Sequence, residues 1–292
     1  MIEIRNNRLN VQMLDPGEGY SGSRFDWNGF ITDVVLDGKY VFCADESLVP
    51  GEGSGGRGIC NEFGIQSPIG YTDAKVGEGF PKIGTGILER TGKEDYDFFK
   101  PYPVKPFETD VSRTDAGALF RVKSMECRGY CVSYEKELSL DDNRLTISYR
   151  LGNTGGKPIE TTEYCHNFVN IDNKSIGPDY ELQFPFKLCG QSVPDVIKVT
   201  DNRINWRVIP EKVFYLAPEG FDKETSGFYW ELRDIERGIG MREDCLFPVE
   251  RIAIWGMPHV VSPEMFIGIH LAPGEEMAWK RIYTFFASEY DR

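Results

Sequence analysis

Short runs that alternate between apolar and polar residues, separated by turn residues, recur along most of the chain. An apolar residue at every second position is typical of a half-buried β-strand, because successive side chains of a strand point to opposite faces. Long helical periodicity is nearly absent. The pattern therefore predicts an all-β protein built from stacked antiparallel sheets. The clearest runs, the first with Asp37-Gly38 as a hairpin turn, are at 29–43, 118–156, 197–209, 250–257 and 265–271.

Residues 45–106 lack this alternating pattern and contain glycine and proline throughout. A connection of this length is unusual inside a compact domain, and long loops on β scaffolds commonly carry function, so we expect an ordered segment that borders a site. Its stretch GEGSGG (51–56) fits G-x-G-x-x-G, but no helix is expected after it, which favours a turn over a dinucleotide site. Without an internal repeat or a recognisable linker, residues 1–292 are predicted to form a single domain.

The formal net charge of −13 narrows the choice of partners. Nucleic acid and anionic membrane surfaces would repel such a protein, so we expect neither. No apolar run approaches the roughly 20 residues of a membrane-spanning helix, and the first residues, MIEIRNNRLNVQ, lack the apolar core of a signal peptide. Seven scattered cysteines fit a reduced protein, and we predict a cytoplasmic location. Cys127 and Cys131 lack the further ligands of a zinc site, so no metal site is expected.

The segment EYCHNFVNID, residues 163–172, surrounds a histidine with polar and aromatic groups. In a strand, Tyr164, His166, Phe168, Asn170 and Asp172 would share one face. Several of these neighbours could orient the imidazole and select its tautomer. From residue types alone, His166 is either a catalytic group on that face or a core histidine with satisfied hydrogen bonds.

Two further segments contain candidates for sugar binding. In SRFDWNG (23–29), Arg24, Asp26 and Trp27 offer a stacking ring and hydrogen-bonding charges, which the apolar faces and hydroxyls of a sugar require. The alternative is a core tryptophan beside a local Arg24–Asp26 ion pair. In GGRGICNEFG (55–64), Arg57 and Glu62 lie among glycines that let the backbone approach a ligand.

Several of these segments resemble the galactose mutarotase-like superfamily, which includes aldose 1-epimerases and hexose-6-phosphate mutarotases. HNFVNID is similar to the motif H-[ST]-Y-F-N-[LV]; the match puts His166 at the catalytic histidine and Asn170 at the asparagine. HLAPGEEMAWKRIYTF resembles the closing turn and last strand, and GGRGICNEFG resembles the arginine loop of the phosphosugar branch. GEGFPKIGTG lies where the family has an HGF-type loop, with Glu78 or Lys82 replacing a substrate-binding histidine. The resemblance implies a β-supersandwich of large antiparallel sheets with a sugar site on its concave face.

The family's general base, a glutamate shortly before the closing turn, has no clear match, because His270 stands near its position. If the last residues before that turn form a strand, Glu264, Phe266, Gly268 and His270 share one face and apolar residues share the other. Strand parity therefore predicts Glu264 as the base, with His270 as the next candidate. His166 would be the acid.

The resemblance implies an aldose 1-epimerase-like protein that acts on a sugar or sugar derivative without a cofactor. Arg24 and Arg57 would bind hydroxyl or acidic groups, and Trp27 or Trp255 would stack on the sugar. A sugar-binding protein without turnover is the first alternative, and a glycosidase or lyase is the second. We expect a monomer or a weak homodimer.

Overall fold

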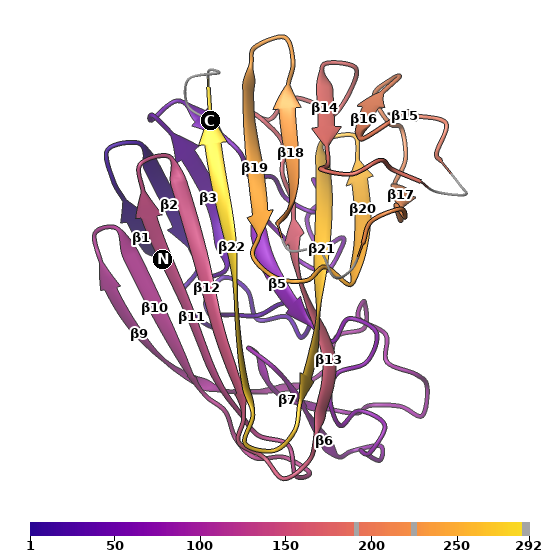
Figure 1. Cartoon of the computed structure of the whole chain (residues 1–292). Helices are drawn as coiled ribbons and strands as arrows, with labels where there is room; N and C mark the ends of the chain where they lie inside the picture. Colours follow the sequence, from indigo (N-terminus) through magenta and orange to yellow (C-terminus); the bar gives the residue numbers. More distant parts are fainter. Residues whose placement is uncertain (190–192, 223–226, 288–292) are drawn as a thin grey trace.

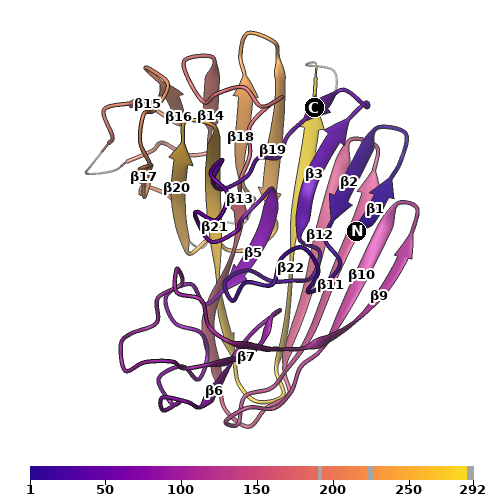
Figure 2. The same cartoon turned by 180° about the vertical axis from the view of Figure 1, so that it is seen from behind.

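The computed structural model describes residues 1–189, 193–222 and 227–287, and these residues fold into three antiparallel sheets without a helix. Two large sheets stack on each other, and a small sheet lies at one end (Figures 1 and 2). The predicted all-β class is confirmed. The predicted hairpin is also present: Leu36 pairs with Tyr40, and Asp37 and Gly38 form the turn with positive φ of 54° and 64°, closed by a bond of 3.0 Å from the Lys39 N–H to the Leu36 carbonyl. No helix of the described part is long and apolar enough to cross a membrane.

The nine-stranded sheet carries the candidate site. Its path is β1-β2-β3-β5-β13-β21-β20-β17, with β4 paired to β3. The strands are β1 (Ile2–Arg5), β2 (Leu9–Met13), β3 (Ile31–Leu36), β4 (Tyr40–Val41), β5 (Ile59–Phe63), β13 (Ile159–Asn167), β17 (Phe214–Leu216), β20 (Arg251–Met257) and β21 (Val260–Leu271).

The ten-stranded sheet lies against it, in the order β15-β16-β14-β18-β19-β22-β12-β11-β10-β9. Its strands are β9 (Glu108–Thr114), β10 (Gly117–Lys123), β11 (Val132–Asp141), β12 (Arg144–Asn153), β14 (Tyr180–Gln183), β15 (Ile197–Thr200), β16 (Arg203–Trp206), β18 (Phe228–Asp234), β19 (Ile239–Cys245) and β22 (Glu276–Phe286). The small sheet contains β6 (Gly79–Lys82), β7 (Gly86–Glu89) and β8 (Val104–Pro106).

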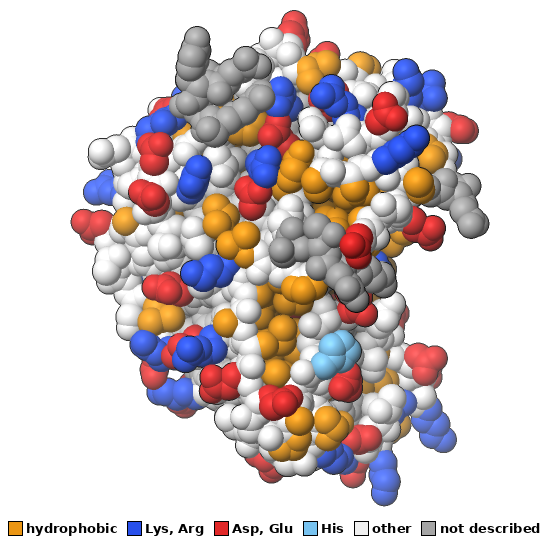
Figure 3. Space-filling model, viewed as in Figure 1, with side chains coloured by type: hydrophobic (Ala, Val, Ile, Leu, Met, Phe, Trp, Pro, Cys, Tyr) orange, Lys and Arg blue, Asp and Glu red, His pale blue; other side chains and the backbone are white. Residues whose placement is uncertain are grey.

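The main core lies between the two large sheets. Strands such as β11 alternate strictly between buried and more exposed residues, because one face packs on the core and the other meets solvent. On the face seen in Figure 3, acidic and basic side chains are interspersed with apolar ones. Strands β13 and β21 differ, since most of their residues are buried on both faces. A second layer of structure therefore covers the outer face of the nine-stranded sheet at its centre.

All seven cysteines are free thiols, and Cys43, Cys60, Cys165 and Cys245 are buried. We expect thermal unfolding to give the same Tm with and without a thiol reductant, because no cross-link constrains the unfolded chain. Differential scanning fluorimetry in both conditions measures this. The exposed Cys189 is the thiol most open to oxidation, so Cys189→Ser is the control for intermolecular cross-linking. A reductant-dependent fall in Tm in that variant would contradict the prediction.

Candidate functional site

The central strand β13 separates two sets of side chains as its alternation predicts. Tyr164 and His166 face the outer side of the nine-stranded sheet, where both line one pocket. Asn167 points the other way, and its side chain accepts a hydrogen bond from the Tyr283 hydroxyl of the opposing sheet at 2.9 Å. His166 is 4% exposed, so it is a largely buried residue at the bottom of an open pocket.

The pairing of β13 with β21 brings Glu264 to His166. Tyr164 lies opposite Phe266, and Val169 lies opposite Val261. The same register puts His166 directly opposite Glu264, and side chains opposite each other on one face are close neighbours. The His166 Nε2 and Glu264 Oε1 atoms are 3.2 Å apart. The predicted face of Glu264 is therefore observed, and the two proposed catalytic groups contact each other.

Ser262 joins this pair, and sequence reasoning missed it. Its Oγ lies 2.7 Å from His166 Nδ1 and 3.2 Å from Glu264 Oε1, and it accepts a hydrogen bond from the Asn167 backbone N–H at 3.0 Å. Ser262 precedes Glu264 by two residues, so strand parity could have placed both on one face. Parity alone does not reveal the partner strand.

Burial makes the neutral forms of both groups more favourable. It raises the pKa of Glu264 from its ordinary value of 4.5 to about 8, opposed mainly by the Arg24 charge. Burial also lowers the pKa of His166 well below its ordinary value, and Arg24 adds to that shift. At neutral pH the pair therefore holds one exchangeable proton, which lies on Glu264 in its resting state. Strongly shifted titrating groups in a pocket are typical of catalytic sites.

Arg24 lies beside this pair in a buried ionic cluster. Its Nε donates to Glu62 Oε2 at 2.9 Å, its Nη1 donates to Ser54 Oγ at 2.7 Å, and its Nη2 donates to the Tyr164 hydroxyl at 3.0 Å. Glu46 approaches the same guanidinium at 3.6 Å. The alternative of a local Arg24–Asp26 pair is therefore wrong, because Glu62 and Glu46 are the ionic partners of Arg24.

Glu62 and Lys82 form the buried base of this cluster. Lys82 Nζ donates to Glu62 Oε1 at 3.2 Å, and the Tyr164 hydroxyl donates to Glu62 Oε2 at 2.6 Å. Burial alone would raise the pKa of Glu62, but Lys82 and Arg24 outweigh it and hold that pKa below its usual value. Neither Glu62 nor Lys82 lines the pocket, but Glu62 contacts the lining residues Arg24 and Tyr164.

Aromatic rings form much of the pocket wall. The Trp255 ring, which lines the pocket, meets the His166 ring edge-on at a centroid distance of 5.5 Å, and the fully buried Phe168 ring, which is not part of the lining, stacks on the His166 ring at 3.8 Å. Arg24 lies over the Phe98 ring at 4.4 Å. The cavity measures about 390 Å³, large enough for a monosaccharide. Its described lining includes Arg24, Glu46, Glu52, Phe98, Phe99, Tyr164, His166, Tyr215, Trp255 and Glu264.

Three predicted binding residues lie away from this pocket. Arg57 has a half-exposed side chain that pairs with Asp45 at 3.3 Å. Trp27 donates from Nε1 to the Gly22 carbonyl at 2.8 Å and borders a different hollow. Asp26 is fully buried, accepts from the Tyr134 hydroxyl at 2.7 Å, and lies among core groups. For Trp27, the alternative of a core residue fits the structure better.

Two further candidates also have structural partners instead of a place in the pocket. Asn170 donates from Nδ2 to the His259 carbonyl at 2.8 Å and accepts from the Asn173 N–H at 3.2 Å. Strand β13 ends at Asn167, so the predicted alternation does not continue to Asn170. His270 is exposed near the far end of β21 and pairs with Glu160. Of the predicted set, the structure brings Arg24, His166, Trp255 and Glu264 together in the pocket.

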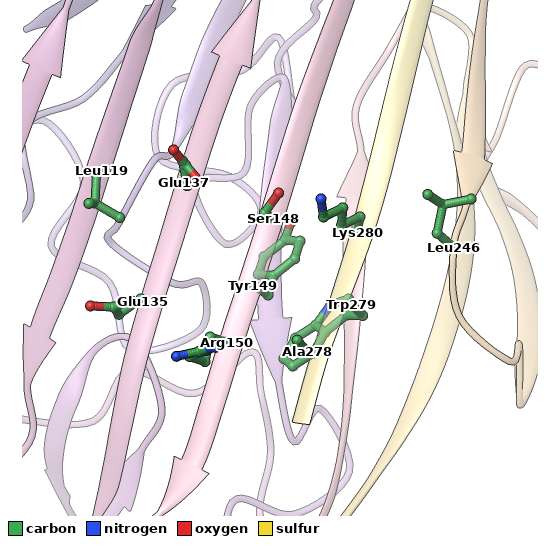
Figure 4. A pocket seen from close by; sticks show the side chains of 10 residues that line it. All are labelled: Leu119, Glu135, Glu137, Ser148, Tyr149, Arg150, Leu246, Ala278, Trp279 and Lys280. Carbon is green, nitrogen blue, oxygen red and sulfur yellow. The ribbon is translucent and has the colours of Figure 1, made fainter. Parts of the chain in front are cut away.

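A second hollow of about 520 Å³ lies on the ten-stranded sheet, between β10, β11, β12 and β22 (Figure 4). Of its charged residues, Glu137, Arg150 and Lys280 are solvent-exposed and Glu135 is half-buried. Tyr149 and Trp279 belong to the core behind them. It contains neither a histidine nor a buried carboxyl group. The described residues also contain no group of three or more His, Cys, Asp or Glu able to hold a metal ion. The pocket at His166 is therefore the better candidate for acid–base chemistry.

Comparisons with known proteins identify structures that share the fold of this chain. No protein-family model and no curated protein matches the sequence. Solved structures do match. A galactose mutarotase related enzyme from Lactobacillus acidophilus is 14% identical, with a TM-score of 0.63 over 99% of this chain and 98% of its own.

Two further solved structures agree with it. A galactose mutarotase-like protein from Lactobacillus casei is 14% identical, with a TM-score of 0.63 over 98% of this chain and 100% of its own. A putative aldose 1-epimerase from Escherichia coli is 12% identical, with a TM-score of 0.61 over 98% of both chains. The whole described chain therefore has the galactose mutarotase-like fold.

Proposed function

We propose that this protein is an aldose 1-epimerase-like enzyme that interconverts the anomers of a sugar. One observation carries the proposal: His166 and Glu264 lie 3.2 Å apart at the bottom of a pocket walled by aromatic rings. Mutarotation needs one group that gives a proton and one that takes a proton at adjacent oxygens, and a buried acid–base pair provides both. The solved structures that share the fold include two described as putative aldose 1-epimerases, which supports this choice.

One complete reaction leaves the number of protons on His166 and Glu264 unchanged. Glu264 gives its proton to the ring oxygen while His166 Nε2 takes the proton of the anomeric hydroxyl, and the bond between the anomeric carbon and the ring oxygen breaks. The resulting aldehyde rotates and presents its other face. On closure, the new ring oxygen returns its proton to Glu264, and His166 returns a proton to the aldehyde oxygen. These starting roles are the reverse of the sequence-based assignment, because burial leaves the resting proton on Glu264.

The charges around the pocket favour an uncharged sugar. Among its described lining residues, Arg24 supplies the single positive charge, and that charge is shared with Glu62 and Glu46. Each guanidinium nitrogen of Arg24 already donates to a protein oxygen. Glu46 and Glu52 add negative charge to the lining. A phosphate group would find no free cation here, whereas the aromatic wall suits the apolar face of a sugar ring.

Exchange between anomers, measured by saturation-transfer NMR, tests this function. We expect the protein to accelerate exchange of at least one uncharged aldose. We also expect the 6-phosphate of that aldose to bind at least about tenfold more weakly, equivalent to about 1.4 kcal/mol. Tighter binding of the phosphate would contradict the charge argument. A sugar that binds without accelerated exchange would favour the alternative of a binding protein, and release of products from glycosides would favour a glycosidase.

The contact between Glu264 and His166 weighs against the alternative of a non-catalytic sugar-binding protein. That alternative rested on the absence of a clear match to the family's glutamate, and Glu264 lies directly opposite His166. A pocket for binding alone would not require a carboxyl group with so strongly raised a pKa beside a histidine.

A further inference from the structure

We infer that Ser262 is a positioning residue that holds His166 in the Nδ1–H tautomer, with Nε2 free to accept a proton. The inference goes beyond the identity of the proton-transfer pair, and its kinetic consequence rests on the function proposed above. Two observations support it. One backbone hydrogen bond is missing between β13 and β21, and few hydrogens are available to Ser262, His166 and Glu264.

Pro263 creates the interruption. The register that pairs Tyr164 with Phe266 and Val169 with Val261 places Asn167 opposite Pro263. Proline has no backbone N–H, and Asn167 satisfies the Pro263 carbonyl with its side-chain Nδ2 at 2.6 Å instead of with its backbone. The Asn167 backbone N–H is thereby free to donate to Ser262 Oγ at 3.0 Å. This bond fixes the Ser262 hydroxyl beside the histidine.

Counting hydrogens then limits what Ser262 can do. A serine hydroxyl has one hydrogen to donate and two lone pairs that accept. One lone pair accepts from the Asn167 N–H, and the remaining partners are His166 Nδ1 at 2.7 Å and Glu264 Oε1 at 3.2 Å. If the hydroxyl donates to Glu264, its second lone pair accepts from His166 Nδ1–H. All three partners are then satisfied.

This arrangement agrees with the single proton that the pair holds. With the hydrogen of His166 on Nδ1, the Nε2 lone pair faces Glu264 Oε1, and the protonated carboxyl can donate to it across 3.2 Å. Burial of both groups supports this neutral state, since neither then carries a charge in a site screened from water. Ser262 thus keeps Nε2 unprotonated, as acceptance of the anomeric proton requires.

Nitrogen-15 NMR of the imidazole rings tests the inference directly, without any sugar. The chain has three histidines, so His166 can be assigned with His166→Asn, and the exposed His270 is an internal reference. In the wild-type protein near neutral pH, we expect the Nδ1 of His166 to give a protonated, pyrrole-type signal and Nε2 an unprotonated one. In Ser262→Ala, Nδ1 loses its partner, and we expect the hydrogen to move to Nε2.

Ser262→Thr is the matched control, because it keeps the hydroxyl and should keep the wild-type tautomer. A protonated Nε2 in neutral wild-type His166 would overturn the inference, as would an unchanged tautomer in Ser262→Ala. If the alanine variant does not fold, the wild-type and threonine spectra still decide the question.

Turnover gives a second readout. At metal sites, loss of the partner that orients a ligating histidine typically costs about 10–100-fold, and we take this as the scale for a hydrogen bond that orients an imidazole. We expect Ser262→Ala to lower kcat by that factor with KM nearly unchanged, and Ser262→Thr to restore most of it. A wild type without anomerase activity would refute the proposed function and leave the NMR result to decide on the tautomer.

Discussion

Glu264→Gln is expected to remove anomerisation while sugar affinity stays close to that of the wild type. Glutamine keeps the shape of the side chain and can hydrogen-bond, but it can neither give nor take the proton that the reaction moves. General acid–base assistance is typically worth about 10²–10⁴-fold, so kcat should fall by that factor. Exchange rates from NMR and affinities from calorimetry measure the two quantities.

The pH profile of the wild-type protein should show the same need for a proton on Glu264. The raised pKa of Glu264, about 8, means that the pair keeps its proton below that pH and loses it above. We therefore expect kcat/KM to fall as pH rises through about 8. The sign is opposite to that of an enzyme whose carboxyl group must be ionised, which would gain activity in the range above pH 4.5.

Two further variants show whether the pair acts as a unit. His166→Asn should be about as damaging as Glu264→Gln, and the double variant should be little worse, because both groups act in one transition state. Glu137→Gln, which makes the same change in the hollow of the ten-stranded sheet, should leave turnover unchanged. Full activity in Glu264→Gln would show that the base lies elsewhere and would argue against the proposed pair.

Arg281→Met is expected to destabilise the fold more than any other single charge removal proposed here. Arg281 lies fully buried behind the site, where Nη1 donates to Glu243 at 2.6 Å and Nη2 donates to Glu163 at 2.8 Å. Removing the cation leaves two buried carboxylates with neutral donors alone, the Asn61 amide for Glu163 and the Trp230 indole and Asn167 amide for Glu243. Removing one partner of a buried ion pair typically lowers the free energy of unfolding by about 3–5 kcal/mol. Chemical denaturation at neutral pH measures the loss.

The matched control is Arg121→Met, which breaks an exposed ion pair with Glu135 at 2.8 Å. Solvent-exposed pairs of this kind contribute only about 0–1 kcal/mol. Replacing Glu163 and Glu243 with glutamine in the Arg281→Met background should recover part of the lost stability, because the unpaired charges are then gone. A cost for Arg281→Met no larger than that of the Arg121 control would contradict this account of the buried network.

The fold class was accessible from the sequence because it depends on local signals. Alternation and turn residues such as Asp37-Gly38 act within a few residues, and both were observed as predicted. Parity also gave the correct faces for His166 and Glu264. The contact between them was not accessible, since it depends on the register of two strands that are far apart in the chain. For the same reason, Ser262 was missed although it lies two residues before Glu264.

The binding residues were harder to predict, because an arginine in a glycine-rich loop has the same local pattern whether it binds a ligand or meets solvent. Arg57 was expected in the pocket and instead pairs with Asp45 at the surface. Arg24 does line the pocket, but its burial with Glu62 and Lys82 depends on three separate segments. The charged network of Arg281 was not foreseen, since charged residues on strands usually face solvent.

The order of strands in the nine-stranded sheet also determines when the site can form during folding. The neighbours β5, β13 and β21 come from residues 59–63, 159–167 and 260–271, so each contact between them closes a very long loop. Pairing of distant strands is intrinsically slow, because chain entropy is lost before the contacts form. During synthesis on the ribosome, the contact between His166 and Glu264 can form only after nearly the whole chain has been made. Binding of a sugar should therefore report the last steps of folding, after the hairpins of the ten-stranded sheet have formed.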